Sequence, residues 1–217
     1  MSQPEAEQKL PDYYECVARD VVEICSPREG VWVDLGCGEG PLAFALAELS
    51  GSVLVLVDPN REALARAVSK ARELGLSWRT VPVYGQAESL PLADDSVDLV
   101  VSRGSIFFWE DRPTGLREVY RVLRPGGKAM LGGGLGNTYP LWARREFIRR
   151  RREGARKQGG DALRSFQEVR SRDTFRHWAE EAGLASFEVV GEAALPEDDP
   201  NTGLGLWLIF EKEQEQP

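Results

Sequence analysis

The residues best placed to do chemistry form a glycine-rich segment after a short apolar run. Residues 31–40 read VWVDLGCGEG, with glycines at positions 36, 38 and 40. Such glycines let the backbone turn tightly and approach a ligand, because no Cβ stands in the way. Asp34 stands two residues before the first of these glycines, at the end of the apolar run. A carboxylate buried there needs a partner, because burying an unpaired charge is costly. Asp58 ends the next apolar run, 22 residues after Gly36, a spacing typical of an acid that accepts both hydroxyls of a ribose.

Further motifs continue this pattern over roughly residues 30–133. VDLGCGEG and LVDPN are followed by GQAESLP, then by DDSVDLV, and finally by REVYRVLRPGG. In this order they resemble the class I S-adenosylmethionine-dependent methyltransferases, in particular the subgroup that acts on small molecules. The resemblance implies that S-adenosylmethionine is the cofactor and that its methyl group passes by in-line transfer to a small-molecule acceptor. The sequence does not identify that acceptor.

The resemblance also implies which residues hold the cofactor. Gly36 and Gly38 would pass the backbone beside its methionine part, and Asp34 would hold its amino group, directly or through water. Asp58 would accept hydrogen bonds from the ribose hydroxyls. Because Asp58 is a carboxylate at the tip of a strand, we expect it to lie outside the core.

Four further residues would complete the cofactor site by the same resemblance. Gln86 and Ala87 would lie beside the adenine, and the side-chain oxygen of Gln86 would accept from the adenine amine where many relatives carry an acid. Ser102 and Arg103 end a predicted strand, where the family places backbone contacts to the methionine end.

Aromatic and acidic residues near these motifs have two interpretations each. Tyr14, or its neighbour Tyr13, could close over the cofactor carboxylate or could pack its helix onto the sheet. Residues 106–109, which read IFFW, could line the acceptor site or belong to the core. Relatives often have histidine there and this chain does not, so Glu110 and Asp111 are the candidates for a general base.

Strand and helix patterns alternate around the motifs. Apolar runs predict strands at 31–35, 53–57, 80–84 and 97–102, and from 128 after a turn at 124–127; helices are expected over 12–24, 41–49, 61–74, 113–123, 139–157 and 172–181. This alternation indicates a Rossmann-like, doubly wound α/β fold with a mostly parallel sheet.

The C-terminal runs depart from that alternation. Residues 187–192 and 204–211 are apolar with no helix between them, which predicts an antiparallel hairpin at one edge. The resemblance independently implies a seven-stranded sheet whose last strand is antiparallel. We expect residues 1–217 to form a single methyltransferase domain, with residues 135–171 as a helical lid inserted in it.

One segment is strongly basic although the chain carries a net charge of −8. Residues 141–157 contain eight Arg or Lys and two Glu, a net of +6. Arg145, Arg149, Arg152 and Arg156 share one helical face. This face could clamp an anionic acceptor or contact nucleic acid, or it could be a solvated surface that offsets acidic neighbours.

Composition argues against several other kinds of site. An acidic chain lacks the basic footprint of nucleic-acid binders, and SRGS stands where base-amine methyltransferases carry an Asn/Asp-Pro-Pro-aromatic motif. Three scattered cysteines and one histidine do not suggest a metal site, and Cys37 is interpreted as a packing residue. The N-terminal residues lack a signal-peptide pattern, and no apolar run approaches the roughly 20 residues of a membrane span. We therefore expect a cytoplasmic protein.

Two alternative functions remain open at this point. An NAD(P)-dependent oxidoreductase would need a glycine at position 41, where this chain has Pro41. A non-catalytic S-adenosylmethionine-binding subunit or regulator would keep the same binding residues, so that only turnover would distinguish it from an enzyme.

Overall fold

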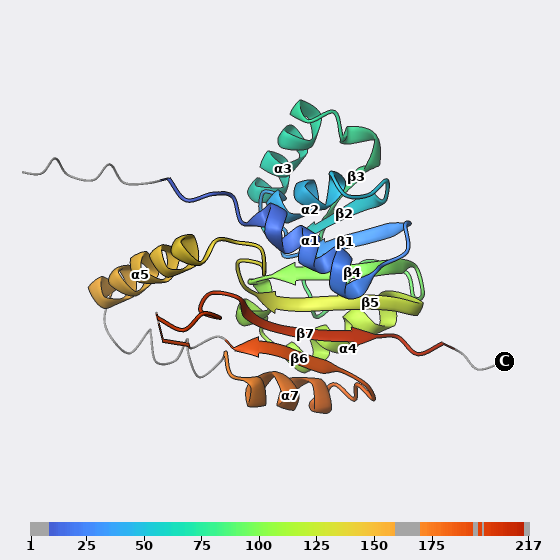
Figure 1. Ribbon diagram of the computed structural model, residues 1–217. Coiled ribbons are helices and arrows are strands. Elements are labelled where there is room, and N and C mark those ends of the chain that lie inside the picture. Colours follow the sequence, from blue (N-terminus) through green and yellow to red (C-terminus); the bar gives the residue numbers. More distant parts are fainter. Residues whose placement is uncertain (1–8, 159–169, 193–194, 197, 215–217) are drawn as a thin grey trace, which may run out of the picture.

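A seven-stranded sheet with strand order β3-β2-β1-β4-β5-β7-β6 forms the centre of the molecule (Figure 1). The computed structural model describes residues 9–158, 170–192, 195–196 and 198–214. The strands are β1 (Val31–Leu35), β2 (Val53–Asp58), β3 (Thr80–Tyr84), β4 (Val97–Arg103), β5 (Leu123–Gly133), β6 (Glu188–Glu192) and β7 (Gly205–Glu211). The expected Rossmann-like fold is confirmed.

Helices cover both faces of this sheet. They are α1 (Tyr14–Cys25), α2 (Pro41–Ala47), α3 (Arg61–Glu73), α4 (Arg112–Val122), α5 (Leu141–Gln158) and α7 (Arg172–Glu181), with short 3-10 turns η1 (Ser77–Arg79) and η2 (Ser105–Phe108). Side chains alternate across β1: Val33 and Leu35 pack into the core with α4 and α7, whereas Trp32 packs with α1, α2 and α3. Burial on both faces explains why β1, β2 and β4 are almost continuously apolar.

The C-terminal hairpin forms at one edge of the sheet, as predicted. β7 pairs antiparallel with both β5 and β6, so it lies inside the sheet while β6 forms the edge. The strand order follows from α7, which precedes β6 and packs against α4 and β6. β6 is thereby set one strand away from β5, and β7 fills the space between them.

The predicted turn at residues 124–127 is instead part of a strand. β5 begins at Leu123, which pairs with Val97, and the next paired residue is Lys128, opposite Leu99. Residues 124–127 therefore bulge out of the ladder without ending it. Arg124 secures the bulge through an ion pair of 2.8 Å with the buried Asp98.

Helix α5 lies beyond the carboxyl ends of β4 and β5 (Figure 1). α5 is the basic helix that the sequence predicts within the 135–171 lid. Residues 159–169 of that predicted lid fall outside the described part of the chain. Over the described ranges, no helix combines the length and the apolar character that a membrane crossing requires.

Candidate functional site

The glycine turn after β1 is locked onto the end of β2. The amides of Gly36 and Cys37 both donate to the carbonyl oxygen of Val57, at 2.8 and 3.1 Å. Gly36 has a φ of 73°, and a Cβ there would lie 2.1 Å from the Cβ of Ser105. Gly38 also has a positive φ, 57°, but a Cβ there would meet nothing within 4 Å. Packing therefore requires glycine at position 36, whereas position 38 faces open space.

Asp34 is buried at the carboxyl end of β1. Only 4% of the residue is exposed, and its Oδ2 accepts from the amide of Ala43 in α2 at 3.1 Å. Burial, with a further contribution from the negative charge of Asp58, raises the pKa of Asp34 to about 7. A carboxylate in this environment gains from a cationic partner, because an opposite charge offsets the cost of burying it.

Asp58 ends β2 beside the same turn. Its Oδ2 accepts from the amide of Gly38 at 2.7 Å, and its Oδ1 accepts from the amide of Asn60 at 2.8 Å. The residue is only 8% exposed, so the expectation that it lies outside the core is wrong. The strand tip is covered because the glycine turn folds back over it. Each carboxylate oxygen retains a second lone pair for a ligand.

Two neighbouring cavities open along the carboxyl ends of the central strands, sharing Gly36 and Arg103. The smaller has a volume of about 360 Å³ and is lined by Tyr14, Asp34, Gly36, Cys37, Gly38, Glu39, Pro41, Leu42 and Arg103. The larger has a volume of about 490 Å³ and is lined by Leu35, Gly36, Asp58, Pro59, Gly85, Gln86, Ala87, Glu88, Arg103, Gly104, Ser105, Phe108, Trp109 and Glu110.

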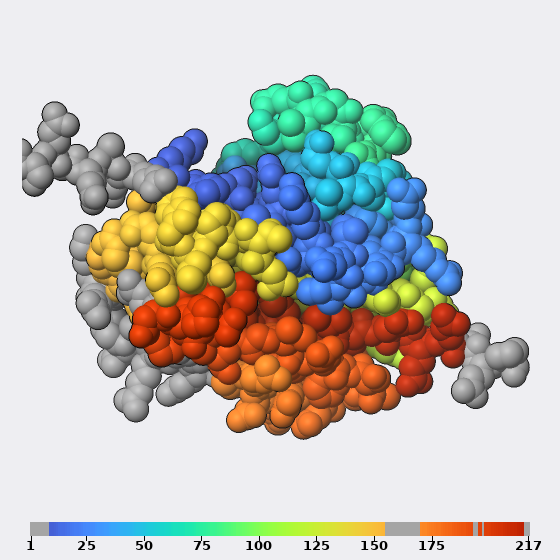
Figure 2. Space-filling model, in the orientation of Figure 1, coloured from blue at the N-terminus to red at the C-terminus, as the bar shows by residue number. Residues whose placement is uncertain are grey.

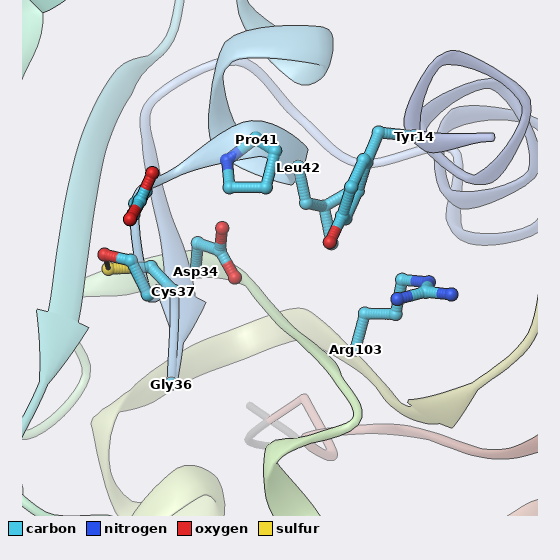
Figure 3. A pocket seen from close by; sticks show the side chains of 9 residues that line it. Tyr14, Asp34, Gly36, Cys37, Pro41, Leu42 and Arg103 are labelled. Atoms are coloured by element: carbon cyan, nitrogen blue, oxygen red, sulfur yellow. Dashed lines mark hydrogen bonds between the residues drawn. The ribbon is translucent and has the colours of Figure 1, made fainter. Parts of the chain in front are cut away.

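Tyr14 and Arg103 face Asp34 across the smaller cavity (Figure 3). The Arg103 Nε donates to the carbonyl of Gly134 at 2.8 Å, and its guanidinium carbon lies 4.1 Å from the ring centroid of Tyr13. This cavity thus presents an acid on one side and a phenol and a guanidinium on the other. An amino acid group with an ammonium and a carboxylate matches that arrangement of charges.

Of the two tyrosines, Tyr14 faces the cavity and Tyr13 packs against other aromatic rings. Tyr14 lines the smaller cavity, and burial raises its pKa above the usual value. The Tyr13 ring instead packs edge-on against Tyr139 and Phe147, at centroid distances of 6.1 and 5.7 Å. Tyr13 therefore packs α1 against α5, and Tyr14 is available to a ligand.

The larger cavity combines an acid, an amide and aromatic side chains. Asp58 lies at one end, and Gln86, Phe108 and Trp109 lie along its wall. Phe108 is 80% exposed, whereas Phe107 and Trp109 are buried. Residues 106–109 therefore serve both of the purposes considered for them. Phe108 lines the cavity, and Ile106 belongs to the hydrophobic core. A nucleoside, with a diol and a flat base, matches this lining.

Comparisons with known proteins agree with the geometry. Residues 33–131 match the family model described as "Methyltransferase domain". The chain is 37% identical over 119 residues to the chloroplastic 2-methyl-6-phytyl-1,4-hydroquinone methyltransferase of Arabidopsis thaliana, a match covering 53% of this chain and 32% of that protein. It is 44% identical over 106 residues to the uncharacterized protein YafE of Escherichia coli, covering 49% of this chain and 50% of YafE.

A solved structure is similar over the whole chain. It is a Methanococcus maripaludis protein assigned as an S-adenosyl-L-methionine-dependent methyltransferase, with a TM-score of 0.76, 27% identity and coverage of 100% of this chain and 99% of the other. The family model, this solved structure and the curated relatives together support a class I S-adenosylmethionine-dependent methyltransferase. The chain spans about a third of the length of the first curated relatives it matches. These similarities favour a methyltransferase over the NAD(P)-dependent oxidoreductase.

The candidate site includes residues that the motifs did not single out. Ser105 donates to the carbonyl oxygen of Leu35 at 2.8 Å and accepts from Trp109 Nε1 at 3.1 Å. It thereby ties η2 to the glycine turn. The side chain of Ser102 is fully buried, with its hydroxyl bonded to that of Ser105, so the contact predicted for Ser102 can come only from its backbone. Side chains alternate along β4, so Ser102 and Arg103 point in different directions.

The two candidate bases are in different environments. Asp111 caps α4, because its Oδ1 accepts from the Thr114 amide at 3.0 Å and its Oδ2 from the Thr114 hydroxyl at 2.6 Å. These bonds lower the pKa of Asp111, which makes it a weaker base. Glu110 lines the larger cavity, so Glu110 is the one of these two residues that remains a candidate base.

The predicted arginine face of α5 contacts the protein's own chain. Arg145 donates to the carbonyl of Asp198 and Arg152 to that of Leu195, both at 2.9 Å. Arg149 pairs with Glu146 at 2.6 Å and with Glu153 at 2.7 Å. The side chain of Arg156 is outside the described residues. Figure 2 shows α5, in gold, lying against the red segment before β7, so the described part of this face docks a loop.

Proposed function

We propose that this protein transfers a methyl group from S-adenosylmethionine to a small-molecule acceptor. The observation that carries the proposal is the pair of buried acids, Asp34 and Asp58, at the ends of adjacent strands with Gly36 and Gly38 between them. Asp34 lines the amino-acid-like cavity and Asp58 lines the neighbouring nucleoside-like cavity, which matches the order in which the cofactor's parts are joined.

The lining residues fit the cofactor's chemical groups. Asp34 would hold the ammonium, and Arg103 and Tyr14 would bind the carboxylate across the smaller cavity. Asp58 would accept from the ribose hydroxyls with its remaining lone pairs, and Gln86 would bind the adenine edge.

The protein's own contribution to the reaction is positioning. The cofactor brings a methyl group already activated on a sulfonium, and the side chains hold the two reactants in line and exclude water. Glu110 would accept a proton from an acceptor that loses one on methylation. Ala87 is buried in the cavity wall and would pack against the adenine.

We also propose the domain organisation, the class of acceptor and the cellular location. Residues 1–217 would form a single methyltransferase domain, with 135–171 as the lid that covers the acceptor. Similarity to methyltransferases of small molecules supports a small acceptor over a nucleic acid. The free cysteines Cys16, Cys25 and Cys37 fit a cytoplasmic location.

Calorimetry with S-adenosylmethionine, S-adenosylhomocysteine and NAD tests the cofactor. We expect about micromolar binding of both sulfur nucleosides, near −8 kcal/mol, and none of NAD. The opposite pattern, with NAD bound and neither sulfur compound, would refute the proposal. A screen of acidic, neutral and aromatic metabolites for release of S-adenosylhomocysteine then tests catalysis. Cofactor binding without turnover on any of them would indicate the non-catalytic alternative.

A further inference from the structure

Two short segments of the chain contribute neighbouring parts of the larger cavity. Residues 86–88 follow β3, residues 108–110 begin at the end of η2, and both groups line the cavity. Under the proposed function, the first segment binds the adenine and the second carries Glu110, the candidate base. A contact between these segments would therefore connect the cofactor to the part of the site that meets the acceptor.

The side chain of Glu88 makes such a contact. Its Oε1 accepts from the amide of Glu110 at 2.7 Å and from the amide of Asp111 at 3.1 Å. Hydrogen bonds from N–H groups to a carboxylate are stronger than those between neutral groups. One carboxylate oxygen thus holds the backbone at the point where Glu110 leads into α4, whose N-cap is Asp111.

Apolar packing joins the same two segments. Ala87 and Trp109 are both buried, and both lie against Gly115 of α4. A Cβ at Gly115 would lie 2.6 Å from the Trp109 ring and 3.4 Å from the Cβ of Ala87. Since closely packed groups move little independently of one another, the position of one segment constrains that of the other.

The turn that carries Glu88 also carries the residue expected to bind adenine. Gln86 and Ser89 form an isolated bridge, in which the amide of Ser89 donates to the carbonyl of Gln86 at 3.3 Å. Glu88 therefore lies within a short turn that begins at Gln86. A base bound to Gln86 would restrict this turn, so Glu88 would accept from its two amides for a larger fraction of the time.

We infer that Glu88 is a positioning residue that couples the adenine end of the cofactor to the backbone of Glu110. This inference rests on the proposed methyltransferase function and adds a residue outside its predicted cofactor contacts. Adenine binding fixes the turn, Glu88 then holds the Glu110 amide, and the candidate base is kept at the cavity. Because coupling is reciprocal, loss of the Glu88 carboxylate also weakens cofactor binding.

The test is amide hydrogen exchange, followed by NMR on the full chain with and without S-adenosylhomocysteine. In the unmodified protein we expect the ligand to slow exchange of the Glu110 and Asp111 amides about tenfold, because their hydrogen bonds to Glu88 open less often. Exchange of these amides that does not respond to bound S-adenosylhomocysteine overturns the inference, since the contact would then serve the fold alone.

Three variants assign the effect to Glu88. E88A removes the acceptor, so both amides should exchange rapidly with or without ligand, and affinity for S-adenosylhomocysteine should fall about fivefold. E88Q keeps an oxygen that can accept both bonds, so it should retain the slowing and bind within about twofold of the unmodified protein. E29A is the matched control and should change neither quantity. Glu29 likewise accepts from a backbone amide, that of Gly51 at 3.0 Å, but these residues precede β1 and β2, at the end of the sheet away from the cavities.

Two further results bear on the outcome. Slowing that persists in E88A would mean that the ligand acts on Glu110 directly, and it overturns the inference. E88D, whose side chain is one methylene shorter, should behave as E88A and carries the test if E88A does not fold. Calorimetry on the unmodified protein separates the two levels of failure, because absence of S-adenosylhomocysteine binding refutes the proposed function, whereas binding without slower exchange refutes only the coupling.

Discussion

At the scale of single residues, the site depends on acids that the fold removes from water. Asp34 and Asp58 are both buried, but their partners differ. Asp58 accepts two backbone hydrogen bonds from its own protein, whereas Asp34 accepts one, from Ala43. Asp34 thus has fewer partners within the protein and more to gain from a bound cation.

The raised pKa of Asp34 predicts that cofactor affinity depends on pH. Its pKa of about 7 in the folded protein lies above the usual 3.8, so its protonated form stabilises the free protein at low pH and this contribution is lost as pH rises through 7. A bound ammonium favours the ionised form. We expect the affinity for S-adenosylhomocysteine to fall about tenfold from pH 8 to pH 6, measured by calorimetry.

The matched control for this prediction is Asp34→Asn, which cannot ionise. The variant should bind more weakly and show a flat profile over the same pH range. A flat profile in the unmodified protein would mean that Asp34 does not bind the ammonium.

Asp58→Ala is expected to weaken both the fold and cofactor binding. Removing the carboxylate leaves the amides of Gly38 and Asn60 without their acceptor, which should lower the free energy of unfolding by about 2–4 kcal/mol. Loss of the ribose bonds should weaken cofactor binding by about 2–4 kcal/mol. Urea unfolding of the free protein and calorimetry separate the two effects. Unchanged cofactor affinity in folded Asp58→Ala would place the ribose elsewhere.

At the scale of elements, the β1–α2 turn serves packing and binding at different positions. The turn is held against β2 by the bonds to Val57, and η2 packs on it through Ser105. A Cβ at Gly36 would meet Ser105, whereas Gly38 has open space beside it and lines the smaller cavity. The same sequence motif thus contains residues with separate roles.

Alanine substitutions at the two glycines should separate those roles. Gly36→Ala places a Cβ 2.1 Å from that of Ser105 and should destabilise the fold by about 3 kcal/mol or more. Gly38→Ala meets no neighbour and should cost only the strain of its positive φ, about 1 kcal/mol, while reducing cofactor affinity. Urea unfolding and calorimetry on both variants test this. Equal destabilisation by the two substitutions would contradict it.

At the scale of the whole molecule, ligand binding couples to stability, because the cavities exist only where β1, β2, β4 and η2 come together. A ligand that binds only the folded chain stabilises it by about 2.7 kcal/mol at a concentration 100 times its Kd. For a chain of this size, we expect S-adenosylhomocysteine to raise the Tm by about 5–10 °C. Thermal unfolding measures this, with NAD as the control. An equal rise with NAD would indicate a different cofactor.

Much of the fold was predictable because its signals are local. The predicted bounds of β1, β3 and α7 agree with the structure, since apolar runs and capping residues act over a few positions. β5 was predicted to start five residues late, because glycine and proline indicate a turn whether or not the strand resumes pairing. The interior position of β7 was not predictable, since strand order depends on contacts between distant segments.

The same distinction applies to the site. The sequence by itself determined the glycine turn and the positions of Asp34, Gly36, Gly38 and Asp58, because a strand, its turn and the following helix are contiguous and place these residues at one edge of the sheet. Only the tertiary structure decided that Asp111 is a cap, that the side chain of Ser102 is buried, and that Arg145 holds a loop. These outcomes depend on which side chains meet across elements far apart in the chain, and no local pattern of residue types records such meetings.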